Sequence, residues 1–287
     1  MTEIFEVHRP RLLAIAYGMV GSIMDAEDIV QEAWFRWNGT DRAAIREPGA
    51  YLTTVVTRLA IDRLRSARYR RETYVGPWLP EPLVREVDSD PADVVVEAES
   101  LSLALLATLE RLNPVERAVF LLREIFDFDY AEIADVVEKS PSACRQIAVR
   151  ARDHVGDPTR KPPATPDMDV LSAFTVAMAT GDIGSLVELL AADAILWSDG
   201  GAERRAARHP IIGPRKIAAF LVGIARRGLD MGATGRPVLA NGAPALLLEL
   251  EGTVYGVMAL EIVDSAVLGV RSVINPDKLA HIGRSAL

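Results

Sequence analysis

The stretch FDYAEIADVVEKSPSACRQIAVRARDHV, residues 128–155, decides how the first half of this chain is expected to fold. Apolar residues at helical spacing run to Val137, Lys139 and Ser140 interrupt them, and Pro141 suits the first position of a new helix. The apolar positions of that new helix follow i, i+3, i+4 and i+7 spacing and are expected to face inward. They are Cys144, Ile147, Ala148 and Ala151. The pattern predicts two helices joined by a short turn.

The outer face of the second helix carries short polar and guanidinium groups, which suit base edges and phosphates in a DNA major groove. Its residues are Ser142, Arg145, Gln146, Val149, Arg150 and Arg152. A plain helical hairpin with a charged outer face would give the same pattern. Glu138 stands in the turn, where glycine is common. These residues alone leave both interpretations open.

The segment 25–37 is another informative helix. Asp25 is expected to cap it, and Asp28 lies where a carboxylate meets free backbone N–H groups. Ile29, Ala33 and Trp37 share one apolar face. The remaining surface shows acids, an amide and an aromatic ring, on Asp25, Glu27, Asp28, Gln31, Glu32 and Phe35. The pattern fits an ordinary capped helix or a surface that docks on a basic partner.

A third helix is expected to open at Pro48 and to carry an arginine cluster. Six arginines and one acid lie between Arg58 and Arg71. Arginine beside hydroxyl and aromatic groups fits phosphate contact and the capture of unstacked bases. The candidates for such contacts are Tyr51, Thr53, Thr54, Arg58, Arg63 and Arg65. The alternative is a solvated helix end whose cations match the helix dipole.

The net charge of −8 is unusual for a protein that binds nucleic acid. Its distribution along the chain is more informative, because residues 73–100 hold seven acids against Arg85 alone, directly after the arginine cluster. This alternation suits a chain that touches DNA at selected places and repels it elsewhere. The acidic total argues against tight, indiscriminate DNA binding without a partner.

Composition bounds the class of protein. With 287 residues and 49% apolar residues, two or three domains with real cores are expected. Cys144 is the single cysteine, so no disulfide framework is expected, and helix core is its expected place. The N-terminal residues do not read as a signal peptide, and no apolar stretch is long enough for a membrane span. We expect a cytoplasmic protein without a membrane partner.

Two proline-rich stretches, 76–82 and 157–166, are expected to divide the chain. The predicted order is a helical domain 1–72, an acidic linker 73–93, a helical domain 94–156, a linker 157–167 and a C-terminal domain 168–287. The last of these changes character, since short helices are followed by strand-like runs broken by turn residues. We predict a multidomain chain with two all-α domains and an α+β domain that has a curved antiparallel sheet.

Three segments together resemble bacterial sigma factors of the extracytoplasmic-function group. They are RPRLLAIAYGMVGSIMDAEDIVQEAWFRW (9–37), YLTTVVTRLAIDRLRSARYRRETY (51–74) and LNPVERAVFLLREIFDFDYAEIADVVEKSPSACRQIAVRARDHV (112–155). The resemblance implies that the 25–37 helix docks on core RNA polymerase. It implies that the 51–71 helix melts and reads the −10 promoter element and that the 140–154 helix reads the −35 element. The implied partners are promoter DNA and the β′ clamp helices and β flap of the polymerase.

The motifs WLPEPL (78–83), WSDGG (197–201) and NPDKL (275–279) look like the SigJ-type subgroup, which carries a SnoaL-like domain with the cone fold of ketosteroid isomerases. Ala202 stands where that subgroup tends to have a third glycine. We expect contacts of an interdomain regulatory kind from Trp78, Leu79, Asp199, Gly200, Gly201, Asn275, Asp277 and Lys278. A domain tethered in this way is expected to need no separate anti-sigma protein.

An enzyme is the weaker interpretation of the C-terminal domain. Four aromatic residues, Phe174, Trp197, Phe220 and Tyr255, could line an apolar cone, but such residues are more often core. Asp199 is the one acid that stands out near them, and His209 and His281 lie in polar, loop-like contexts. No catalytic, cofactor-binding or metal-binding residue is predicted, and a small-molecule ligand in the cone is left open.

The sequence therefore predicts a non-enzymatic transcription initiation factor that acts with core RNA polymerase and is regulated by its own C-terminal domain. Two other classes stay open. One is a ligand-sensing DNA-binding regulator that acts without polymerase. The other is an isomerase or hydrolase fused to a helical module.

Overall fold

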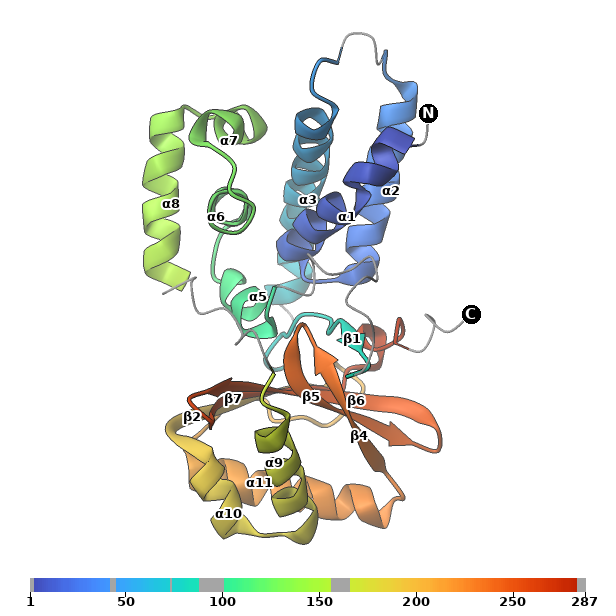
Figure 1. Cartoon of the computed structure of the whole chain (residues 1–287), viewed down its shortest axis with the longest axis vertical. Helices are drawn as coiled ribbons and strands as arrows, with labels where there is room; N and C mark the ends of the chain where they lie inside the picture. The colour runs from blue at the N-terminus through green and yellow to red at the C-terminus, as the bar shows by residue number, and fades with distance from the viewer. Residues whose placement is uncertain (1–2, 42–44, 73, 88–100, 156–165, 283–287) are drawn as a thin grey trace. The chain divides into compact units, whose positions relative to one another are not determined.

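A computed structural model describes residues 3–41, 45–72, 74–87, 101–155 and 166–282, with the side chains of 67–72 left aside (Figure 1). The chain divides into two compact units. The first is made of Met1–Thr73, Pro91–Leu101 and Leu105–Arg160. The second is made of Tyr74–Asp90, Ser102–Ala104 and Lys161–Leu287. The second unit therefore includes most of the stretch that was predicted to be the first linker.

The first unit is helical. Its helices are α1 (Glu3–Val20), α2 (Ile23–Gly39), α3 (Pro48–Glu72), α6 (Pro114–Phe120), α7 (Tyr130–Val137) and α8 (Pro141–Val155). A π-helical turn, η2 (Leu121–Ile125), continues α6, and α5 (Leu103–Leu109) spans the boundary between the two units. Helix α1 packs against α2 and α3, and α6 packs against α8. Tyr17, Trp37, Leu52 and Phe120 are among the large side chains buried in this unit.

Local signals explain where these helices begin. Asn113 caps α6 in a capping box with Glu116, as its place before Pro114 predicts. The predicted cap of α2 is wrong, because the helix begins earlier and the Ser22 hydroxyl accepts the Asp25 backbone N–H at 3.1 Å. Serine and aspartate both cap well, so the sequence alone does not separate them. Asp25 lies in the first helical turn instead.

The second unit is built on a mixed seven-stranded sheet with the order β1-β4-β5-β6-β7-β2-β3. Its strands are β1 (Val84–Arg85), β2 (Leu190–Asp199), β3 (Ile211–Ile212), β4 (Thr234–Ala240), β5 (Ala243–Leu250), β6 (Thr253–Val263) and β7 (Ala266–Val273). The predicted all-antiparallel sheet is wrong at one place, because β2 pairs with β7 in parallel. Strand β1 pairs with β4, so the segment after Tyr74 extends the sheet.

The β4–β5, β5–β6 and β6–β7 hairpins each turn through two residues that have positive φ. The turn pairs are Asn241-Gly242, Glu251-Gly252 and Asp264-Ser265. Such turns match the twist of antiparallel strands, and Asn-Gly is the sequence most suited to them. They set the register of the three consecutive hairpin pairings that join β4 to β7.

Three helices cover one face of the sheet (Figure 1). They are α9 (Met168–Thr180), α10 (Ile183–Leu189) and α11 (Pro214–Asp230). Phe174 of α9 and Leu221 of α11 pack with Leu196, Leu260 and other apolar residues of the sheet into one buried core. A short 3-10 turn, η3 (Pro276–Lys278), follows β7. The space between sheet and helices is thus occupied by apolar side chains.

Candidate functional site

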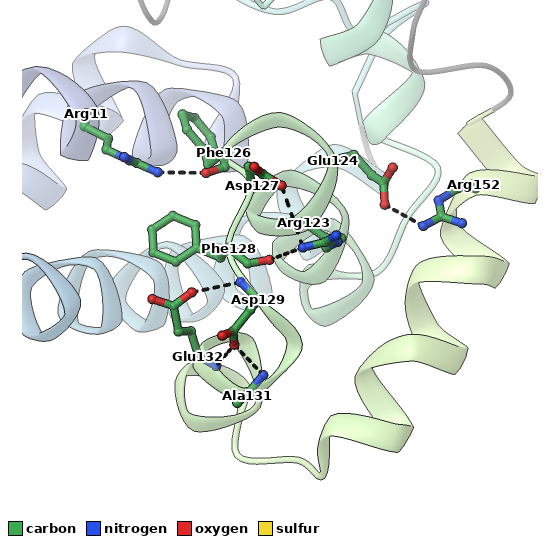
Figure 2. A network of polar contacts seen from close by, with 10 residues as sticks. All are labelled: Arg11, Arg123, Glu124, Phe126, Asp127, Phe128, Asp129, Ala131, Glu132 and Arg152. Carbon is green, nitrogen blue, oxygen red and sulfur yellow. Dashed lines mark hydrogen bonds and ion pairs between the residues drawn. The ribbon is translucent and has the colours of Figure 1, made fainter.

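Helices α7 and α8 form the predicted helix-turn-helix. Asp129 caps α7 and accepts backbone N–H groups from Ala131 and Glu132 at 2.8 Å (Figure 2). Glu138 ends α7 with φ 55°, so the glutamate takes the left-handed conformation that glycine adopts more easily. The Ser140 hydroxyl then accepts the Ala143 N–H at 3.2 Å at the start of α8.

The two faces of α8 separate as the spacing predicts. The buried side chains are Cys144, Ile147, Ala148 and Ala151. Burial raises the pKa of the Cys144 thiol, as expected for a core cysteine rather than a reactive one. Among the residues of the predicted DNA-reading face, the exposed ones are Ser142, Arg145, Gln146, Val149 and Arg150. In α7, Ile133, Ala134 and Val136 are buried, whereas Val137, the last apolar residue of the predicted run, is half-buried.

Arg152 differs from the other candidates on α8. Its guanidinium donates to Glu124 of η2 at 2.9 Å (Figure 2), and Glu124 is largely buried. Arg152 therefore joins α8 to the π-helical turn η2. The side chain keeps 42% of its surface exposed, so its role in reading DNA stays a prediction beside this structural contact.

The junction before α7 is held by a further polar network (Figure 2). Arg123 donates to the Phe128 carbonyl at 2.8 Å. Arg11 of α1 donates to the Phe126 carbonyl at 2.7 Å, and its guanidinium lies 4.9 Å from the centre of the Phe128 ring. These contacts tie the start of the helix-turn-helix to α1 within the first unit.

The predicted docking face of α2 is open to solvent. Ile29, Ala33 and Trp37 are buried, as predicted. Glu27, Asp28, Gln31, Glu32 and Phe35 are exposed, and Asp25 is half-buried. Phe35 keeps 55% of its surface exposed, which is high for a large apolar side chain. The face combines carboxylates with one apolar anchor.

The candidates on α3 are less uniform. Thr53 is 4% exposed, so this residue is not accessible to DNA in the structure, contrary to the prediction. Tyr51 is half-buried, and its hydroxyl lies 3.0 Å from the Thr40 hydroxyl. The Thr54 hydroxyl donates to the Ala50 carbonyl at 2.9 Å. Arg65 is exposed and pairs with Asp62 at 3.2 Å.

Two arginines of α3 are engaged by groups on other elements. Arg63 Nη2 lies 3.0 Å from both Asp25 Oδ1 and Asp28 Oδ2, so it bridges two acids of the docking face on α2. Arg58 donates to the backbone carbonyls of Asp135 and Val136 at 2.8 and 3.1 Å. These carbonyls belong to the last turn of α7, where a cation is electrostatically favoured.

The C-terminal motifs come together in the second unit around a buried ion pair. Lys278 Nζ lies 2.7 Å from Asp199 Oδ2. The other Asp199 oxygen accepts the Tyr74 hydroxyl at 2.5 Å, and Oδ2 also accepts the Leu79 N–H at 2.8 Å. Lys278 donates to the Leu79 carbonyl and lies 3.9 Å from the centre of the Trp78 ring. Burial and the Asp199 carboxylate raise the pKa of the Tyr74 hydroxyl.

The glycine turn and Asn275 complete this cluster. The Gly201 N–H donates to Asp199 Oδ1 at 3.1 Å, and a Cβ on Gly201 would lie 2.7 Å from the Asn275 side chain. Asn275 donates to the Tyr74 hydroxyl at 2.8 Å. Gly200 allows the backbone of Arg204 to approach closely. Ala202 is exposed, so the loop accepts alanine there, and Asp277 is exposed as well.

Several contacts of the segment 74–87 were not predicted. Asn241, buried in the β4–β5 turn, exchanges two hydrogen bonds with the Leu83 backbone, at 3.0 and 2.9 Å. Arg236 of β4 pairs with Glu86 at 2.6 Å. His281, for which the sequence indicated a polar, loop-like context, is half-buried and lies 2.9 Å from the Pro82 carbonyl. The Asn-Gly turn signal was available in the sequence, but nothing local indicated what Asn241 would bind.

The groups considered for an enzyme lie in several different surroundings. Phe174 is core, and Trp197 lies 4.7 Å from the Arg271 guanidinium, which pairs with Glu261. His209 is exposed. Within the described part of the chain, no three His, Cys, Asp or Glu side chains come close enough to hold a metal ion. Among the described helices, none is long and apolar enough to cross a membrane.

Comparison with known proteins identifies the family. Residues 4–70 match Sigma-70 region 2, and residues 102–155 match Sigma-70, region 4. The chain is 39% identical to the ECF RNA polymerase sigma factor SigJ of Mycobacterium tuberculosis, over 96% of this chain and 91% of SigJ. The chain belongs to the extracytoplasmic-function RNA polymerase sigma factors. As such a factor, it directs core RNA polymerase to promoters for transcription initiation.

Two further comparisons agree with this family. The chain is 33% identical to the probable ECF sigma factor SigI of M. tuberculosis, over 96% of this chain and 93% of SigI. The crystal structure of M. tuberculosis SigJ has a TM-score of 0.79 against this structure, at 36% identity and with 98% of each chain covered. The predicted fold class is confirmed, with helical sigma regions followed by an α+β domain. Family membership points to a transcription factor rather than an enzyme.

Proposed function

We propose that this sigma factor docks on the clamp helices of core RNA polymerase through α2, reads the −35 element with α8, and opens the −10 element with α3. The observation that carries the proposal is the division of α8 into two faces. Cys144, Ile147 and Ala151 are buried, whereas Arg145 and Arg150 are exposed on a capped second helix of a helix-turn-helix. This is the arrangement that places side chains in a major groove.

The docking face of α2 supports the polymerase contact. Its exposed acids suit a basic partner, and the exposed Phe35 offers apolar area at the end of the same face. The proposed contact residues are Asp25, Glu27, Asp28, Gln31, Glu32 and Phe35. Interfaces of this kind combine charge complementarity with a buried aromatic anchor.

The −10 surface we propose lies on α3. It comprises Tyr51, Thr54, Arg58, Arg63 and Arg65, without the buried Thr53. Arg58 and Arg63 are engaged by α7 and α2 in the free chain. Within the first unit, the contact of Arg58 with α7 also keeps the two DNA-binding regions close together. The −10 and −35 elements are about 25 base pairs apart, which is about 85 Å on B-DNA at a rise of about 34 Å per 10 base pairs. The two DNA-binding regions of the first unit must therefore move apart when they bind the promoter.

The C-terminal domain supports a regulatory function. In the sequence, the segment 74–87 lies between the two sigma regions, and the domain holds it through Asp199, Asn241 and Lys278. We infer that these contacts with the segment 74–87 limit how far the two sigma regions can separate when the polymerase binds. A regulator of this kind acts within the chain, without a separate anti-sigma protein.

Run-off transcription with purified core polymerase tests the proposed function. The full-length protein should produce a transcript of defined length from a cognate promoter, and core polymerase alone should not. Protein that binds the promoter without polymerase and gives no run-off would instead favour a polymerase-independent regulator. The same reaction supplies active holoenzyme for measurements of promoter binding.

A further inference from the structure

An open pocket of about 710 Å³ in the second unit has no assigned function. One wall is the loop 201–208 that joins β2 to β3, and the other includes Val75 and Gly76. Ser198, at the end of β2, lines it as well. Gly76 has φ +82°, and a Cβ there would lie 3.7 Å from the Arg208 Cα, so the two walls meet closely at this point.

The loop is anchored from within. The Arg204 N–H donates to the Gly200 carbonyl at 3.1 Å. The Arg204 guanidinium donates to the carbonyls of Tyr255 and Ile274 and lies 4.2 Å from the centre of the Tyr255 ring. Arg204 is therefore a structural residue that holds the loop on strand β6 and the end of β7. Arg205 and Arg208 lie on the loop that these contacts of Arg204 anchor.

Arg205 and Arg208 carry the charge of this pocket. Both are exposed, and neither forms an ion pair with any residue that the structure describes. The stretch 204–216 has five arginines and lysines and no acid, in a chain whose net charge is −8. Glu203 contributes the one acid among the described residues of the lining. Cations gathered in this way on an acidic protein favour an anionic ligand.

The short chain connection between α3 and the pocket indicates which anionic ligand to expect. Val75 follows the end of α3 at Glu72 by three residues. Three extended residues span at most about 11 Å. The chain therefore joins the end of the helix proposed to bind the −10 element directly to one wall of this pocket.

We propose that Arg205 and Arg208 bind the phosphate backbone of promoter DNA next to the −10 element. Guanidinium groups match phosphate oxygens in charge and geometry. The pocket is open and both arginines lie at the surface, which suits a continuous strand passing over it. The inference rests on the function proposed for α3. A free phosphorylated small molecule has the same chemistry, and its binding is an outcome that the experiment separates.

The test measures binding of full-length holoenzyme to promoter DNA as a function of salt, for parent protein and the Arg205→Ala/Arg208→Ala variant. Removing one phosphate contact lowers the slope of log affinity against log salt by about 0.9 on duplex or about 0.7 on single strands. We expect the variant slope to be smaller by about 1.4 to 1.8. Between 50 and 200 mM salt, the parent should then lose about 7- to 12-fold more affinity than the variant.

The matched control is Arg226→Ala/Arg227→Ala, which removes two exposed arginines near the C-terminal end of α11. It makes the same change in net charge. Its slope should stay at the parent value. Equal slopes for all three proteins would overturn the proposal. If the parent holoenzyme gives run-off transcripts while the slopes are equal, the pocket proposal fails and the proposed sigma function stands.

Two additional measurements identify the ligand. A photo-crosslinking residue in place of the exposed Ala202 should label a promoter strand beside the −10 element. Titration of the protein with ATP and with inorganic pyrophosphate, followed by calorimetry, tests the small-molecule source. If either binds the parent but not the Arg205→Ala/Arg208→Ala variant while the salt slopes are equal, the pocket serves a phosphorylated small molecule and the DNA proposal is wrong.

Discussion

Lys278 and Asp199 form a buried ion pair, with 2.7 Å between Nζ and Oδ2 and side-chain exposures of 8% and 0%. Both partners are also bonded to the segment that links the sigma regions, through Leu79 and Tyr74. Such a pair stabilises little by itself, because desolvation offsets the attraction, but removal of one partner leaves a buried charge uncompensated. The pair therefore makes retention of the segment sensitive to a single substitution.

The first prediction follows from this pair. Asp199→Asn or Lys278→Met should each lower the free energy of unfolding of the second unit by about 3–5 kcal/mol. The double variant should be less destabilised than the sum, since no unpaired charge remains. Urea denaturation followed by tryptophan fluorescence provides the measurement. Glu86→Gln, which breaks an exposed pair with Arg236 on the same segment, should cost less than about 1 kcal/mol.

The elements that were predicted well depend on local signals. The two faces of α8 follow from helical spacing, and its start follows from Ser140 and Pro141, all within one stretch of chain. The hairpins of the second unit follow from alternation and turn residues in the same way. The left-handed conformation of Glu138 was not predicted, although the sequence places this residue in a turn where glycine is common.

The docking of residues 74–87 on the second unit could not be predicted in this way. Its bonds join groups far apart in sequence, such as Leu83 to Asn241, and several of them use backbone groups that every residue carries. The parallel pairing of β2 with β7 likewise depends on the order of strands in the sheet rather than on alternation. The motifs pointed to Asp199 and Lys278, but only their geometry shows that the two form an ion pair.

The second prediction concerns polymerase docking. Asp28→Lys/Glu32→Lys should abolish co-purification with core polymerase, because it reverses two charges on the exposed face of α2. Helical content by circular dichroism should stay at the parent level. Glu188→Lys/Asp193→Lys makes the same charge change on exposed positions of the second unit and should co-purify normally. Normal co-purification of the α2 variant would contradict the docking assignment.

The third prediction distinguishes residues of α8 that read DNA from a residue that stabilises the helix-turn-helix. Arg145→Ala and Arg150→Ala should weaken binding of holoenzyme to a −35 element by about 1–3 kcal/mol for each bidentate arginine–guanine pair that the substitution removes. Arg152→Ala should instead destabilise the helix-turn-helix, because Arg152 is bound to Glu124. Electrophoretic mobility assays with base-substituted promoters measure the first effect and thermal denaturation the second. Unchanged promoter preference in the Arg145 and Arg150 variants would place the reading face elsewhere.

The fourth prediction concerns promoter opening. Alanine at Arg58, Arg63 or Arg65 should reduce permanganate reactivity of thymines in the −10 element, since these arginines are proposed to hold the opened strand. Arg58→Ala should also destabilise the free protein, because Arg58 holds the last turn of α7. Arg65, which pairs with Asp62 at an exposed position, should affect opening without that loss of stability. Parent-level reactivity in all three variants would contradict the −10 assignment.

The fifth prediction tests regulation by the C-terminal domain. Truncation after residue 160 removes the partners of the segment 74–87. If the domain sets the distance between the sigma regions as proposed, the truncated protein loses that control. Run-off transcription by the truncated protein should then differ from that of the full-length protein. Trp78→Ala and Asp199→Ala should change transcription in the same direction, because each removes a contact between that segment and the C-terminal domain.

Leu229→Ala supplies the control for these variants, since it removes an exposed apolar side chain of α11 away from the segment and should transcribe normally. Limited proteolysis of the segment 74–87 reports its release independently of transcription. Release with unchanged transcription in the truncated protein and in both point variants would show that the domain holds the segment without regulating initiation. A change in opposite directions would show instead that Trp78 and Asp199 act on separate steps.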